Sequence, residues 1–90
     1  MIDFQPIRDA ALTPHDLSGL LGISRVTCSK WLNGHSQPHR LLEEDVLRVI
    51  DAVRKAVEAD RLPVPFTVTR RERRHYIQTA ISEVRTSTVA

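Results

Sequence analysis

The sequence contains few of the residues that small proteins use in place of a large core. It has a single cysteine, Cys28, so an internal disulfide is excluded, which fits a reducing cytosol. Its only aromatic residues are two phenylalanines, one tyrosine and one tryptophan, so aliphatic side chains must build the core. No apolar run approaches the roughly eighteen residues of a membrane span. The first ten residues also lack the basic and apolar segments of a signal peptide, so we expect a cytoplasmic protein.

Acidic residues are missing from one long interval. The net charge of the 90 residues is only +2, yet no Asp or Glu occurs between Asp16 and Glu43. The basic residues of that interval are Arg25, Lys30, His35, His39 and Arg40. A second basic cluster, RRERRH, occupies residues 70 to 75. Basic patches of this size suit a polyanion such as nucleic acid, and a solvated charged face is the alternative.

No set of residues typical of a catalytic or metal site stands out. The sequence offers no Ser/His/Asp set, no paired carboxylates and no phosphate-binding glycine loop. The spacings of Cys28, His35 and His39 are compatible with zinc ligands. A structural zinc site needs four ligands, however, Cys28 is expected in the core, and Pro38 interrupts the two histidines. We therefore expect no enzymatic activity, no metal and no cofactor.

Two short helices are predicted in succession, after a weaker helical segment at residues 4 to 12. Thr13 is a good N-cap for the first helix, and Gly22 can end it in the left-handed conformation. Ser24 caps the second helix and Gly34 closes it. The tight turn between them predicts two helices that cross steeply and pack through their apolar sides.

The second of these helices has two different faces. At about 100° per residue, Cys28 and Trp31 share one side, which predicts that they are core residues. The other side carries mainly short polar residues and cations: Arg25, Val26, Thr27, Ser29, Lys30 and Asn33. Trp31 would anchor the helix and hold this outer face rigidly in solvent. An α-helix fits the major groove of B-DNA, where Arg and Lys reach guanine acceptors and an apolar side chain suits a thymine methyl.

The rest of the chain predicts a long helix and a C-terminal extension. An apolar stripe from 42 to 57, with acids at its start, predicts the long helix. Pro63 and Pro65 end it and indicate an extended connector or a short edge strand. Thr69 and Glu72 have the spacing of a capping box for a last helix. The apolar face of that helix comprises Tyr76, Ile77, Ala80, Ile81 and Val84.

Residues 12 to 34, LTPHDLSGLLGISRVTCSKWLNG, resemble the helix-turn-helix of phage repressors and Cro proteins, the Xre type. The resemblance lies in a leucine-bearing first helix, Gly22 at the turn followed by Ile23, the Ser24 cap and a Trp-x-Asn-Gly ending. It implies an all-α small helical bundle of the lambda repressor-like kind, with residues 12 to 60 as its scaffold. The C-terminal extended segment and helix would be an addition.

The resemblance also assigns roles to individual residues. Base readout falls on Arg25, Val26, Ser29 and Lys30. Contacts to phosphates or flanking bases fall on Ser24, Thr27 and Asn33. Beyond the residues that carry the resemblance, His35 and Arg40 are expected to make such contacts because they are basic and follow the helix closely. Pro14 stands where many members place a glutamine that binds the DNA backbone. Gly19 inside the first helix has no explanation in the sequence, because glycine there costs about 1 kcal/mol relative to alanine.

These features predict a sequence-specific transcriptional regulator, a repressor of phage or mobile-element type in the cytoplasm of a bacterial or phage-infected cell. It would bind a palindromic double-stranded DNA operator as a homodimer. We expect a DNA-binding core at 1–62, a dimerisation element at 63–85 and a disordered tail at 86–90. The expected dimerisation residues are Phe66, Val68, Tyr76, Ile77, Ile81 and Val84.

Two alternatives remain open from the sequence. The chain is a protein-binding regulatory module, such as an antitoxin or anti-activator, if residues 63 to 84 engage a partner protein. Within the 70–75 cluster, the arginines either pair with the acids around Glu58 and Asp60 or face an anionic partner. The last helix likewise either folds back on the 42–57 helix or pairs with a second subunit.

Overall fold

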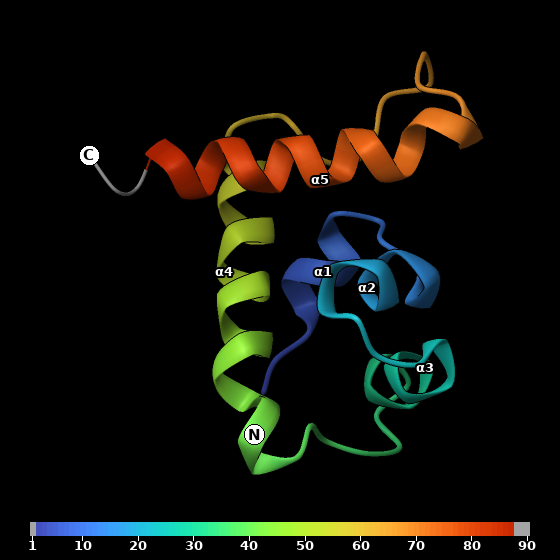
Figure 1. The fold of residues 1–90 in the computed structure, drawn as a ribbon, viewed down its shortest axis with the longest axis vertical. Coiled ribbons are helices and arrows are strands. Elements are labelled where there is room, and N and C mark those ends of the chain that lie inside the picture. Colours follow the sequence, from blue (N-terminus) through green and yellow to red (C-terminus); the bar gives the residue numbers. More distant parts are fainter. Residues whose placement is uncertain (1, 88–90) are drawn as a thin grey trace.

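The computed structural model describes residues 2–87, with side chains up to Val84, and this part of the chain is all-α without a strand. The all-α prediction is therefore confirmed. In chain order the elements are α1 (Gln5–Asp9), α2 (Pro14–Leu21), α3 (Arg25–Leu32), the short 3₁₀ helix η1 (Arg40–Leu42), α4 (Glu43–Glu58) and α5 (Arg70–Ser87) (Figure 1).

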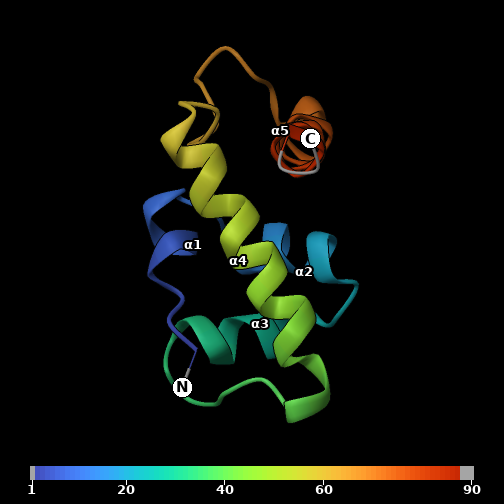
Figure 2. The same ribbon diagram turned by 90° about the vertical axis from the view of Figure 1, so that its left-hand side faces the viewer.

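The long helices α4 and α5 cross steeply, and the three short helices lie together on one side of α4 (Figure 1). Figure 2 shows α5 end-on beside the C-terminal part of α4. α5 also packs against α2, so it touches both the long helix and the first of the two helices joined at Gly22. In this arrangement α2 packs against α3 as well as against α5.

The predicted starts and ends of α2 and α3 are confirmed. The Thr13 hydroxyl accepts the backbone N–H of Asp16 at 3.2 Å, and the Asp16 carboxylate accepts the N–H of Thr13 at 2.9 Å. Gly22 ends α2 with a φ of 70°, a left-handed conformation that residues with a Cβ adopt at a cost. The Ser24 hydroxyl accepts the N–H of Thr27 at 3.2 Å and caps α3.

Trp31 and Cys28 are core residues, as the sequence predicts. Trp31 is 3% exposed, and its ring stacks on that of Phe4 with the centroids 6.0 Å apart. Cys28 is fully buried, and burial raises the pKa of its thiol. One continuous core joins all five α-helices: Phe4, Ile7, Ala10, Leu12, Leu17, Cys28, Trp31, Val46, Ile50, Ala52, Val53, Ala56, Leu62, Ile77, Ile81 and Val84.

The division of the chain into a core and a separate dimerisation element needs correction. Of the expected dimerisation residues, Ile77, Ile81 and Val84 are buried in the same core as Trp31, because α5 folds back on α4. Tyr76 is partly buried and donates its hydroxyl to the carbonyl of Arg61 at 2.7 Å. The chain therefore covers this face itself, and the expectation that a second subunit must cover it is wrong. Val68 is partly buried, and only Phe66 of the set is fully exposed.

The connector before α5 contains a turn and no strand, so of the two alternatives the short edge strand is not formed. The N–H of Val68 donates to the carbonyl of Pro65 at 3.1 Å, which closes a turn. Thr69 then caps α5 by accepting the N–H of Glu72 at 3.4 Å, while its hydroxyl donates to the Glu72 carboxylate at 2.7 Å. α5 continues to Ser87, so the expected boundary at 85 falls inside a helix. Residues 88–90 of the expected tail lie outside the described residues.

Candidate nucleic-acid interface

The outer face of α3 carries the four residues expected to read bases: Arg25, Val26, Ser29 and Lys30. We call these four residues the reading face. Val26 is 64% exposed, whereas Cys28 and Trp31 on the opposite side of the same helix are buried. A large apolar side chain that stays exposed beside two cations is available for contact with a partner. The predicted division of α3 into a buried side and an exposed side is thus confirmed.

Both ends of α3 are fixed to the rest of the molecule. At its N-terminus, the Ser18 hydroxyl of α2 donates a short hydrogen bond to the carbonyl of Ile23 and spans the turn at Gly22. At its C-terminus, Arg8 of α1 donates from Nη2 to the carbonyl of Leu32, an acceptor left free by the helix end. Bonds at both ends, together with the Trp31 anchor, hold the reading face in one orientation.

An open surface hollow of about 560 Å³ lies between α3 and the start of α2. We call it the α3 hollow. It is lined by Thr13, Pro14, His15, Arg25, Val26, Ser29, Lys30, Asn33 and His35. The whole reading face belongs to it, as do two of the residues expected to contact phosphates or flanking bases, Asn33 and His35. The structure thus brings six of the nine expected DNA-binding residues to one surface.

The other three expected residues do not line the α3 hollow. Ser24 and Thr27 lie at the start of α3 and bond to each other, because the Ser24 hydroxyl accepts the N–H of Thr27. The Thr27 hydroxyl also lies 3.4 Å from Ser24 Oγ. Arg40 begins η1 at the foot of α4, away from the start of α2 (Figure 1). It is exposed, and it joins the interface only if the partner extends past the end of α3.

Two polar residues of the hollow were not identified from the sequence. Thr13 and His15 stand on either side of Pro14, the position where the resembled family places a backbone-binding glutamine. Pro14 has neither a polar side chain nor an N–H, but its neighbours present a hydroxyl and an imidazole to the same surface. A sequence signal existed, since His15 lies in the first turn of α2, two residues after the N-cap, but the direction of its side chain depended on how α2 packs.

The charges around the hollow are unevenly neutralised. Within the described residues, Arg25 and Lys30 form no ion pair. Asp16 of α2 is the acid nearest to Arg25 in sequence; its side chain is 7% exposed and pairs with Arg73 of α5 at 2.8 Å. Burial alone would raise the pKa of Asp16, but hydrogen bonds from Arg73 and Thr13 outweigh it and hold that pKa below the usual value. The carboxylate therefore stays charged, and its charge is offset by Arg73.

The partner of Arg73 corrects one of the alternatives for the 70–75 cluster. The cluster does not pair with Glu58 or Asp60. Glu58 is taken by Arg54 of its own helix at 2.8 Å, and Arg73 reaches an acid 57 residues earlier in the chain. The other three arginines of the cluster, Arg70, Arg71 and Arg74, are exposed and form no ion pair with any described residue.

The part of the chain that the structure describes contains neither a candidate metal-binding cluster nor a helix that could span a membrane. No group of three or more His, Cys, Asp or Glu side chains there is placed to hold a metal ion. Cys28 and the two histidines once considered as zinc ligands do not converge, since Cys28 is buried while His35 and His39 are exposed. None of these helices combines the length and the apolar character that crossing a bilayer requires.

Comparison of the chain with models of protein families, with curated proteins and with solved structures gives no match. The resemblance of residues 12 to 34 to the Xre-type helix-turn-helix therefore remains a hypothesis drawn from the sequence. The geometry described above is independent of it, because it follows from packing, exposure and charge in this chain alone.

Proposed function

We propose that the chain is a sequence-specific double-stranded DNA-binding transcriptional regulator in which α3 enters the major groove. Arg25 and Lys30 would donate to guanine acceptors, Ser29 would bond a base edge, and Val26 would contact a thymine methyl. Asn33, His35 and the start of α2 would contact phosphates on either side. A repressor of phage or mobile-element type is the form of regulator that the sequence resemblance favours.

One observation carries this proposal. The reading face combines two unpaired cations with an exposed valine on a helix that buries Cys28 and Trp31 on its other side. An ordinary solvated helix gains little from leaving its cations without partners, as the exposed Arg–carboxylate pairs of α4 illustrate. Unpaired cations on a rigid helix of this width suit a groove that supplies phosphates and base acceptors.

Operator binding as a homodimer is a further part of the proposal. One recognition helix reads only about four or five base pairs, so two copies on half-sites roughly 34 Å apart would supply the missing specificity. The buried face of α5 cannot provide the contact without unfolding. A dimer contact from the 63–84 region would therefore centre on Phe66, which is fully exposed in the connector before α5.

Selection of fragments from a random double-stranded pool by the purified full-length protein tests the proposal. We expect a recurring short motif, repeated as a palindrome if two copies bind. A binding titration on the selected site should show a preference over random DNA and a loss of affinity with rising salt. Enrichment of no motif, together with no salt-sensitive binding, would contradict a DNA-binding role and favour the protein-binding module.

A further inference from the structure

The first turn and a half of α5 carries a cluster of cations that the fold does not use. Arg70, Arg71 and Arg74 are exposed and have no carboxylate partner among the described residues. We call these three residues the basic end of α5. The positive end of the helix dipole lies at the same place and disfavours cations there. Folding alone gives no reason for three arginines at this end, whereas an anionic partner does.

The fourth arginine of the cluster shows how this end of α5 is held. Arg73 donates from Nε and Nη2 to the Asp16 carboxylate and from Nη2 to the carbonyl of Ala11 at 3.2 Å. These bonds fasten α5 to the start of α2. They also offset the one negative charge at the start of α2, which would otherwise repel a phosphate approaching this surface.

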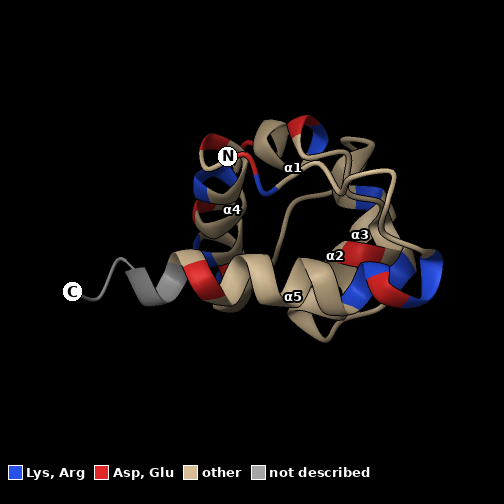
Figure 3. Ribbon diagram, turned by 90° about the horizontal axis from the view of Figure 1, so that it is seen from above, with Lys and Arg blue, Asp and Glu red and all other residues tan. Residues whose placement is uncertain are grey.

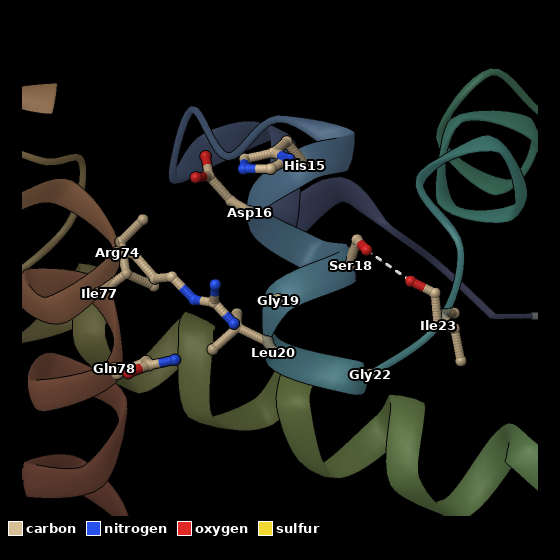
Figure 4. A pocket seen from close by; sticks show the side chains of 10 residues that line it. All are labelled: His15, Asp16, Ser18, Gly19, Leu20, Gly22, Ile23, Arg74, Ile77 and Gln78. Carbon is tan, nitrogen blue, oxygen red and sulfur yellow. Dashed lines mark hydrogen bonds between the residues drawn. The ribbon is translucent and has the colours of Figure 1, made fainter. Parts of the chain in front are cut away.

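The start of α2 joins the basic end of α5 to the reading face. His15 lines the α3 hollow, and it also lines a second groove between α2 and α5, in which Arg74 lies (Figure 4). In that groove Arg74 extends from α5 across α2, and its guanidinium lies next to Gly19. One side chain, His15, thus separates the surface containing Arg74 from the surface containing Arg25.

The two views of the molecule agree with this continuity. In Figure 1 the start of α5, the start of α2 and α3 lie along the same edge of the molecule. Figure 3 shows the basic first turns of α5 beside the start of α2, on the side where α3 also lies. A DNA strand that borders the groove entered by α3 would pass over the start of α2 and reach the basic end of α5.

We propose that Arg70, Arg71 and Arg74 form a phosphate clamp that extends the DNA interface beyond α3. This inference rests on the proposed function, since it assumes that α3 lies in the major groove. The clamp contacts the backbone next to α2 and carries no sequence information, so it strengthens binding to operator and random DNA alike. Arg73 has a different role and positions the clamp through its ion pair with Asp16.

The salt dependence of binding tests the clamp, because each phosphate contact adds about 0.9 to the slope of log affinity against log salt concentration. The test variant is R70Q/R71Q/R74Q in the full chain. The matched control, R48Q/R54Q/R61Q, removes the same charge from arginines that are paired with acids on and beside α4. A third variant, R70K/R71K/R74K, keeps the charge. Circular dichroism verifies that all three fold.

We expect the glutamine variant of the clamp to lower the slope by about 2 to 3 and to weaken binding at least about tenfold, equally on selected and random DNA. The lysine variant and the control should keep a slope close to that of the wild type. Equal weakening by the clamp variant and the control would overturn the proposal, because net charge alone would then be responsible. An unchanged slope in the clamp variant overturns the clamp and leaves the proposed function intact. Wild-type protein that fails to bind DNA at all overturns both.

Discussion

Two groups of cations in this protein differ in their partners. Within α4 and the segment directly after it, every Lys and Arg has a carboxylate within reach: Arg48 with Glu44, Arg54 with Asp51 and Glu58, Lys55 with Asp51, and Arg61 with Glu83. On α3 and at the start of α5, Arg73 is the one cation among the described residues that has a carboxylate partner. Arg25, Lys30, Arg70, Arg71 and Arg74 have no acidic partner.

This difference separates cations whose charge is offset within the fold from cations whose charge is not. The pairs of α4 are short-range helix contacts between exposed side chains, and such pairs contribute about 0–1 kcal/mol each. They neutralise that side of the molecule. The unpaired cations lie along one edge of the molecule, around the start of α2 (Figure 3). No carboxylate of the described residues offsets their charge. A total net charge of +2 hides this separation, because it averages over both groups.

The largest effect on stability is expected when α3 loses the Trp31 anchor. Trp31→Ala removes a buried indole stacked on Phe4, and we expect a cost of about 3–5 kcal/mol in the free energy of unfolding. A domain of this size has little stability to spare, so much of the protein would unfold. Denaturant unfolding, monitored by circular dichroism, measures the loss in the free energy of unfolding.

Leu47→Ala is the matched control, since Leu47 is an apolar residue of α4 that is 51% exposed. Its truncation should change the free energy of unfolding by less than about 0.5 kcal/mol. Similar losses in the two variants would show that Trp31 is not the anchor of the reading face.

The second test removes the one paired arginine at the start of α5. Arg73→Gln takes a guanidinium from the largely buried Asp16 carboxylate, and we expect a cost of about 1.5–3 kcal/mol near neutral pH. Arg54→Gln should cost clearly less, because solvent screens the exposed pairs of Arg54 on α4. Thermal and denaturant unfolding of both variants measure this difference in destabilisation. Equal destabilisation would show that the Arg73–Asp16 pair is no stronger than the pairs of α4.

The same pair predicts how stability depends on pH. The pKa of Asp16 is lower in the folded protein than the ordinary value of 3.8, so folding favours the charged carboxylate. Its contribution is fully present above pH 3.8 and is lost as the pH falls through the folded-state pKa. The stability difference between wild type and Arg73→Gln should therefore be constant near neutral pH and shrink in strong acid. A difference that grows on acidification would contradict this assignment.

The third test concerns DNA and separates the two groups of cations by their function. Arg25→Ala should cost about 1–3 kcal/mol on the selected site and relax the preference at one base position. Arg48→Ala on α4 should leave both the affinity and the preference unchanged. If Arg25→Ala weakens selected and random DNA equally, Arg25 contacts only the backbone, and base readout must be assigned to another residue.

Local chemistry was readable from the sequence, and long-range pairing was not. The caps at Thr13 and Ser24, the turn at Gly22 and the burial of Trp31 depend on neighbours within a few residues, so their patterns sufficed. The partner of Arg73 lies 57 residues away, at a position that depends on how α5 folds back. For the same reason the sequence left open whether α5 folds back on α4.

In the candidate site, too, features set by local sequence were predicted and features set by long-range packing were not. The exposed side of α3 was predicted because helix periodicity alone separates it from Cys28 and Trp31. The contribution of His15 was missed, because it depends on the packing of α2 against α3. Arg40 was assigned to the site because of its charge, but the chain turns away before η1 and places it outside the α3 hollow.

The smallest expected effect on stability distinguishes Gly19, inside α2, from Gly22, which ends it. A Cβ added at Gly19 would meet the nearest atom, Nε of Arg74, at 3.7 Å, an ordinary van der Waals contact. Gly19→Ala should therefore gain helix propensity without strain and stabilise the protein by about 0.5–1 kcal/mol. Gly22→Ala has open space around it but requires a φ of +70°, so it should destabilise by about 1–2 kcal/mol. Denaturant unfolding checks the opposite signs. If Gly19→Ala is instead destabilising, the guanidinium of Arg74 cannot yield to a methyl group, and the start of α5 is held more rigidly against α2 than the Asp16 ion pair alone explains.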